Sequence, residues 1–544
     1  MKRELELADI QGIVINGYAR AGFPKARHLF LHIAEAAAGR QFLTQIFSSV
    51  TTSVRWPKES RAAEQADAPA RNITVKPKVT LNVGFTLYGL HALGVPVNTL
   101  RMMPTEFIEG MATRSKILGD VGDSAPSQWD PIWREVEGAQ PVHVWVTLNA
   151  QMQADGSPVP ELEEKTAWLR RLCAASNGGV TILTGHAPDG RDYQEASAVL
   201  FRDDRGQARV TPNEHFGFHD GIGNPVFDGQ LEGREEKGDV IGGGKLLPDG
   251  SWRPLATGEF LLGYPDEAQE IPPAPEPVEF SRNCTFMVYR KLHENVATFR
   301  RYIDETAALY QAHCGMPSRD EARETIVAKM VGRWSNGVPL MVAPTFRESQ
   351  EFLARSKKAE QSGDKATGAA LLRQYNDFKY RDDPDGIRCP MTSHVRRTNT
   401  RDMLDPESDP AKRTGSSLND RRRILRRGLP YGEAPAGDAG VRDDGDHGII
   451  FIAFCASLFR QFEFVQQQWI QYGLDFNAGN DTCPLSGRHG ADAKFVIPVD
   501  PESGRAPFIC GGLPQFVTTR GGGYFFVPSI TALRMIAMGV IDPT

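Results

Sequence analysis

The 544-residue sequence has little net charge, no paired-cysteine motif and no long apolar run. Its formal charge of −6 gives no electrostatic reason to expect nucleic acid or an anionic membrane as a partner. Its seven cysteines are odd in number, widely spaced and never arranged as CxxC, which favours reduced thiols over a disulfide framework. The N-terminus MKRELELADIQG has basic residues but lacks the apolar segment of a secretory signal, and no stretch of 18 apolar residues could span a membrane. We therefore expect a cytoplasmic protein without a membrane span, of unspecified oligomeric state.

The first half of the chain alternates strands and helices. Apolar and polar residues alternate in the strand-like segments, and apolar residues recur at helical spacing in the others. The expected strands are Arg27–Ile33, Lys78–Thr86, Val142–Leu148 and Val180–Thr184, and the expected helices are Glu35–Phe47 and Leu162–Ser176. The order strand–helix–strand–strand–helix–strand predicts a ferredoxin-like unit.

The second half predicts a similar unit at the level of element order. Its expected strands are Glu259–Tyr264, Thr285–Tyr289, Gly448–Phe454 and Gly523–Val527, with helices at Asn295–Ala307 and after the third strand, as far as Ile470. The sequence thus predicts an α+β fold of two ferredoxin-like halves, each an antiparallel sheet with packed helices. The expected domains are an N-terminal half at 1–210, a connecting segment at 211–255 and a C-terminal half at 256–544 with a charged surface insertion at about 348–385.

A glycine-rich stretch, EHFGFHDGIGNP, covers Glu214–Pro225. Its glycines predict a loop whose backbone can approach a ligand closely, and Asp220 lies in that loop. One alternative is a simple turn in which Asp220 bonds its own backbone. Another is a metal site made by Glu214, His215, His219 and Asp220, although the glycines argue against the helix that would align the histidines.

A second stretch, CPMTSHVRRTNTRD, covers Cys389–Asp402 and contains His394. A neutral imidazole is a common iron ligand. The neighbouring Arg396 and Arg397 could pair with the carboxylates of a bound cofactor. The alternative is an exposed polar loop with a surface histidine.

Two further segments carry unusual charges. RRRILRRGLPYG, from Arg421 to Gly432, is either an anion-binding patch or a solvated helix end. In the apolar segment Ile449–Ile470, Glu463 falls on the apolar side of a predicted helix, where a carboxylate must be paired or protonated. It either forms a structural salt bridge or accepts the second N–H of a metal-bound imidazole.

Together and in this order, these segments resemble the dye-decolorising peroxidase family, in its larger, insertion-rich branch. GFHDG at 217–221 is similar to the family's GxxDG motif, and the His394 segment to the one that bears the haem-ligand histidine. RRILRRGLPYG resembles the segment with the distal arginine, and FIAFCASLFRQFEFVQQQWI the closing strand and helix. The opening DIQGIVINGYAR is also similar, so the likeness runs from about residue 8 to about residue 530.

The resemblance implies a haem peroxidase with one haem b per chain, bound between the sheet and the helices of the C-terminal half. His394 would be the proximal iron ligand, Asp220 the distal acid–base residue, and Arg426, in preference to Arg427, the distal arginine. Glu463 would hold the proximal imidazole. Gly428 departs from the pattern, because many members carry Asn or Ser two residues after the distal arginine.

The resemblance also implies contacts at the haem edge and plane. Arg397 would pair with a haem propionate, and Ile449, Phe451 and Gly221 would lie against the cofactor. The expected partners are hydrogen peroxide and small organic reductants such as dyes and phenols.

A second hypothesis is a non-catalytic haem carrier or sensor on the same fold, which needs His394 but not Asp220. A third is an enzyme that acts on the porphyrin itself or on another small oxidant.

Overall fold

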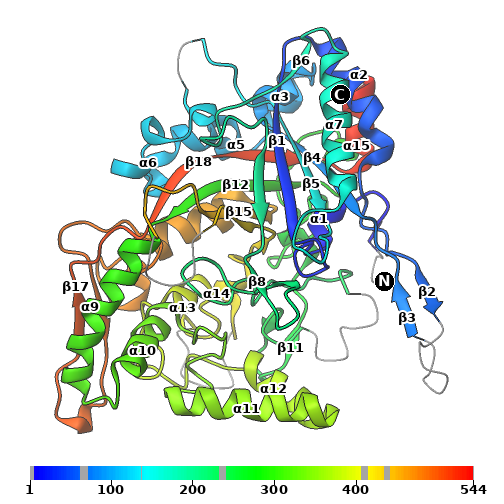
Figure 1. Cartoon of the computed structure of the whole chain (residues 1–544). Helices are drawn as coiled ribbons and strands as arrows, with labels where there is room; N and C mark the ends of the chain where they lie inside the picture. The colour runs from blue at the N-terminus through cyan, green and yellow to red at the C-terminus, as the bar shows by residue number, and fades with distance from the viewer. Residues whose placement is uncertain are drawn as a thin grey trace.

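One antiparallel sheet runs through the centre of the molecule (Figure 1). The computed structural model describes residues 5–61, 71–135, 138–231, 240–405, 415–433 and 441–542. The strands lie in the order β13-β15-β12-β18-β4-β5-β1-β6, with β14 beside β15 and β7 (Gln194–Ser197) beside β1. The first four of the ordered strands come from the C-terminal half of the chain and the last four from the N-terminal half.

The N-terminal half of the sheet has the predicted elements. They are β1 (Lys25–Ile33), α2 (Ala36–Ile46), β4 (Val79–Phe85), β5 (Val144–Ala150), α7 (Pro160–Ala174) and β6 (Val180–Ile182). Strand β5 is buried along its whole length, as expected of a central strand covered on both faces. Figure 1 shows α2 and α7 on the outer side of this half, with α15 (Ile530–Met538) packed against α2.

The C-terminal half repeats the same topology. Its elements are β12 (Thr285–Glu294), α9 (Val296–Cys314), β13 (Leu425–Arg426), β14 (Leu429–Tyr431), β15 (Gly448–Cys455), the helical segments η8 (Leu458–Glu463) and η9 (Val465–Ile470), and β18 (Val517–Val527). With β13 and β14 counted as one strand, both halves have the strand order 4-1-3-2 of a ferredoxin-like unit. The halves meet where β18 pairs with β4 through Phe526 and Phe85. The predicted fold class is confirmed.

In the C-terminal half one strand prediction was wrong and one strand was missed. The segment 259–264 forms turns after a short 3-10 helix, and its Phe260, Leu261 and Leu262 are buried as core without pairing in the sheet. The missed strand is β13–β14, in the arginine-rich segment, where buried Leu425 and its neighbours pair with β15. Burial therefore does not require a strand, and pairing with a neighbour overrides an unfavourable local sequence.

The charged region near 348–385 is mainly a pair of helices, α11 (Phe346–Ser362) and α12 (Lys365–Asn376), at one edge of the molecule (Figure 1). Phe352 and Leu371 turn inward and join a small apolar cluster, while most charged side chains face solvent. The domain boundaries stay a prediction. All seven cysteines are free thiols, and no helix within the described ranges is long and apolar enough to cross a membrane.

Candidate active site

A cavity of about 410 Å³ lies against the C-terminal half of the sheet. Its sheet wall includes Arg290 and Leu292 of β12 and Ile449 and Phe451 of β15. The register pairs Leu292 with Ile449 and Arg290 with Phe451, and alternate residues of a strand face the same side. The remaining walls include parts of the glycine-rich loop, the arginine-rich strand and the His394 segment.

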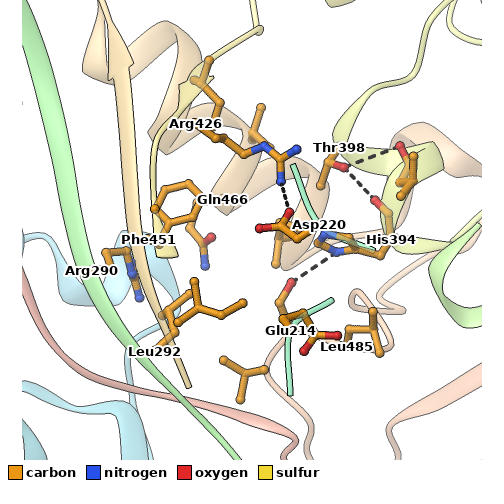
Figure 2. A pocket seen from close by; sticks show the side chains of 18 of the residues that line it. Glu214, Asp220, Arg290, Leu292, His394, Thr398, Arg426, Phe451, Gln466 and Leu485 are labelled. Carbon is orange, nitrogen blue, oxygen red and sulfur yellow. Dashed lines mark hydrogen bonds and ion pairs between the residues drawn. The ribbon is translucent and has the colours of Figure 1, made fainter. Parts of the chain in front are cut away.

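An ion pair between Asp220 and Arg426 projects into this cavity (Figure 2). Arg426 Nη1 lies 2.9 Å from Asp220 Oδ1, and Arg426 Nη2 donates to the Ile222 carbonyl at 2.8 Å. The neighbouring Gly221 has φ +75°, a conformation that favours glycine, so the turn after Asp220 depends on this residue. The Asp220 side chain is 43% exposed and that of Arg426 34%, which leaves both open to a small molecule in the cavity.

The electrostatics of the pair favour an ionised carboxylate. Partial desolvation inside the cavity acts to raise the pKa of Asp220, but Arg426, the Gly221 N–H and the nearby Arg20 outweigh it, and the net pKa is below the usual value. The adjacent Arg427 has a different role, because its guanidinium donates to the carbonyls of Ile13 and Val14. Of the two neighbouring arginines, Arg426 is the one that meets Asp220.

His394 lines the same cavity from the first turn of α13 (His394–Thr398). Its Nδ1 lies 3.2 Å from Cys483 Sγ and 3.5 Å from Ser486 Oγ. Within the described part of the chain no hydrogen bond engages Nε2, so this nitrogen is available to a ligand in the cavity.

Comparison with known proteins matches both halves of the chain to one family. The model "DyP dimeric alpha+beta barrel domain" matches residues 9–185, and "Dyp-type peroxidase, C-terminal" matches residues 345–478, together more than half of the sequence. Dye-decolorizing peroxidase msp1 of Mycetinis scorodonius is 24% identical over 548 residues, with 98% of this chain and 88% of the relative covered. Multifunctional dye peroxidase DyP2 of Amycolatopsis sp. is 27% identical over 527 residues, with 93% and 91% covered. The crystal structure of a DyP-type peroxidase from Auricularia auricula-judae has the same fold, with a TM-score of 0.70, 22% identity, and 98% of this chain and 100% of that one covered.

The chain belongs to the DyP-type peroxidase family. The resemblance that the motifs indicated is therefore confirmed, and the protein is a peroxidase. The family does not by itself assign the site residues of this chain, whose positions come from the structure.

The prediction that Glu463 holds the His394 imidazole was wrong. Glu463 accepts hydrogen bonds from Arg114 Nε at 2.6 Å and Nη2 at 2.5 Å, and from the Tyr524 hydroxyl at 2.7 Å. The alternative, a structural salt bridge, is what this DyP-family chain has. The helical pattern correctly placed the carboxylate on a buried face, but it carried no information on which partner meets it there. Cys483 and Ser486, which no sequence pattern singled out, lie at the imidazole instead.

The prediction for Arg397 was also wrong. Its guanidinium donates to the carbonyls of Ile470 and Asp481 at 3.1 Å each, is buried against Phe476, and does not line the cavity. Burial lowers its pKa to about 10. Nine other arginines line the cavity: Arg20, Arg290, Arg333, Arg401, Arg422, Arg423, Arg426, Arg427 and Arg488. Among them, Arg290 Nη1 is buried without a hydrogen-bond partner.

Two neighbouring carboxyl groups, Glu214 and Glu294, also line the cavity. Glu214 accepts the N–H groups of Phe216 and Phe218 at 2.7 Å each, and it contacts Glu294. Burial raises the pKa of both groups, and the proximity of Glu214 raises that of Glu294 further. The alternative of a metal site here has no support, because the described residues contain no group of three or more His, Cys, Asp or Glu side chains able to hold a metal ion.

Proposed function

We propose that this peroxidase binds one haem b in the cavity, with His394 as the protein ligand of the iron. We also propose that it reduces hydrogen peroxide and oxidises small organic molecules by single electrons. The observation that carries the proposal is the presence of the His394 imidazole and the Asp220–Arg426 ion pair in one cavity. The names of similar proteins, which include dye-decolorizing peroxidases, support dyes as one class of reductant.

The residues around the cavity fit haem. Leu292, Ile449 and Phe451 offer an apolar surface to the macrocycle. Nine arginines and four acidic residues line the cavity, an excess of positive charge that suits two propionates. The unpartnered Arg290 Nη1 is a donor that such a carboxylate could satisfy. The volume lies within the range of ligand pockets, roughly 300–1,000 Å³.

The chain's own residues can manage the protons of peroxide reduction. When bound, the haem supplies the electrons that cleave the O–O bond. Asp220 Oδ accepts a proton from one peroxide oxygen and returns it to the other, which leaves as water. Arg426 stabilises the negative charge that develops on the departing oxygen. Because the pKa of Asp220 is lowered, the carboxylate remains a base in mild acid.

Absorption spectra of the purified protein, before and after one equivalent of peroxide, test the proposal. A Soret band is expected in the wild type and should be lost or weakened in His394→Ala. Asp220→Asn and Arg426→Leu should keep the Soret band but respond to peroxide much more slowly. Asp192→Asn is a matched control, because Asp192 pairs with Arg170 and does not line the cavity.

The same spectra separate the peroxidase from a haem carrier. A carrier needs His394 but not the ion pair, so unchanged peroxide kinetics in both Asp220→Asn and Arg426→Leu would overturn the assigned roles. A normal Soret band in His394→Ala would overturn the assignment of the iron ligand.

A further inference from the structure

The His394 imidazole has a sulfur neighbour where a carboxylate was expected. Its Nδ1 lies 3.2 Å from Cys483 Sγ, within the range for a hydrogen bond to sulfur. Ser486 Oγ lies 3.5 Å from both the Nδ1 and the sulfur. The expected carboxylate, Glu463, is engaged by Arg114 and Tyr524 instead.

The backbone holds Cys483 in place. Its N–H donates to the Ile470 carbonyl at 2.7 Å, and its carbonyl contacts His489 Nε2 at 2.9 Å and accepts the Gly487 N–H at 3.0 Å. The side chain is fully buried, with no solvent-exposed surface. The sulfur therefore stays beside Nδ1 without any rearrangement of the loop.

The partner of a metal-bound imidazole influences the metal. It fixes the ring orientation and the tautomer, and it makes the ligand more electron-donating as the hydrogen bond strengthens. Cysteine sulfur is a weak hydrogen-bond acceptor, whereas a carboxylate is a strong one. We infer that Cys483 is the positioning residue of the His394 imidazole, holding Nδ1 through its sulfur and setting the reduction potential of the iron. This inference rests on the proposed haem ligation by His394.

The reduction potential of the haem-loaded protein tests this inference. Cys483→Asp places a carboxylate at Nδ1 and should shift the Fe(III)/Fe(II) midpoint potential to more negative values. Cys483→Ala removes the acceptor and should shift it to more positive values. Cys483→Ser, which has a similar volume and an oxygen acceptor, should have a potential closer to that of the wild type than Cys483→Ala. Cys510→Ala removes another buried thiol, on β17 (Phe508–Gly511), and should leave the potential unchanged.

The iron–histidine stretching frequency in the ferrous protein gives a second readout that folding alone would not move. It should rise in Cys483→Asp and fall in Cys483→Ala. If both variants keep the Soret band but match the wild type in potential and stretching frequency, Cys483 has no positioning role and the peroxidase proposal stands. If His394→Ala keeps a normal Soret band, the haem ligation itself fails, and the inference fails with it.

Discussion

Replacement of Glu463 by glutamine should separate a structural carboxylate from one that tunes the haem. The Glu463 side chain is 1% exposed and that of Arg114 9%, and two hydrogen bonds of 2.5 and 2.6 Å join them. Removal of one member of a buried ion pair typically costs about 3–5 kcal/mol, because the other charge stays buried without its partner. Arg114 also pairs with Glu109, so its positive charge stays partly neutralised when Glu463 is replaced. We therefore expect a loss at the lower end, about 3 kcal/mol, in the free energy of unfolding.

Urea unfolding of the haem-loaded protein, followed by circular dichroism, measures this loss. Glu109→Gln is the matched control, because Glu109 is 42% exposed and a partly solvated pair contributes roughly 0–1 kcal/mol. The midpoint potential of Glu463→Gln should change less than that of Cys483→Ala, since the hydrogen bonds described for Glu463 go to Arg114 and Tyr524 and none to His394. A large shift in potential with an unchanged unfolding midpoint would refute the assignment of Glu463 to the Arg114 salt bridge alone.

Three further predictions concern the cavity wall. Asp220→His should move the acid limb of the pH–rate profile for the peroxide reaction upward toward pH 6.5, because the lowered pKa of Asp220 keeps it a base in acid, where a histidine is protonated and cannot accept a proton. Gly428→Asn should destabilise the protein by roughly 1–3 kcal/mol in urea unfolding, since a Cβ there would lie 2.1 Å from the Ile450 carbonyl oxygen. The Glu214–Glu294 pair should make the protein less stable as the pH rises, because both raised pKa values mean that the folded state holds protons more tightly than the unfolded state. The stabilisation that the two bound protons provide is complete below pH 4.5, the ordinary pKa of a glutamate, and is lost as the pH rises through the raised pKa values. The free energy of unfolding falls by at most about 1.4 kcal/mol per pH unit for each proton. Glu294→Gln should flatten this pH dependence.

Each of these predictions has a contrary result. An acid limb in Asp220→His that coincides with that of the wild type would remove Asp220 as the base. A fully stable Gly428→Asn protein would contradict the close approach of the strand, whereas Gly368→Asn, on an open helical surface, is the control expected to cost less. Identical pH–stability curves for the wild type and Glu294→Gln would show that the pair shares no proton.

The fold was predictable wherever its signal was local. Strands β1, β4 and β5 and helices α2 and α7 follow from apolar periodicity, which needs only the segment itself. The strand at 425–431 was missed because its reason is non-local: the segment is rich in arginine, and it becomes a strand only through pairing with β15. The segment 259–264 shows the converse, since its apolar side chains are buried in the core but its backbone forms turns.

The residues of the site could be predicted from the sequence, but the side chains that they contact could not. Asp220, His394 and Arg426 were identified from their segments, and the structure places all three on one cavity. The partner of Glu463 is 349 positions away along the chain, and that of His394 is 89 positions away. A helical wheel shows that a carboxylate is buried, but only the tertiary structure shows which side chain meets it.

The arginine-rich strand shows how a single position decides what reaches the cavity. Leu425 pairs with Phe454 and Leu429 with Ile450 in one continuous register, so β13 and β14 act as one edge strand of β15. Side chains alternate along such a strand, which places Arg426 and Gly428 on the same side and Arg427 on the other. Gly428 lines the cavity, where an Asn or Ser side chain would enter it, but the approach of the Ile450 carbonyl leaves no room for a Cβ. The absence of that side chain therefore follows from the close approach of the Ile450 carbonyl, and Arg426 is the residue of β13 whose side chain meets Asp220 at the cavity.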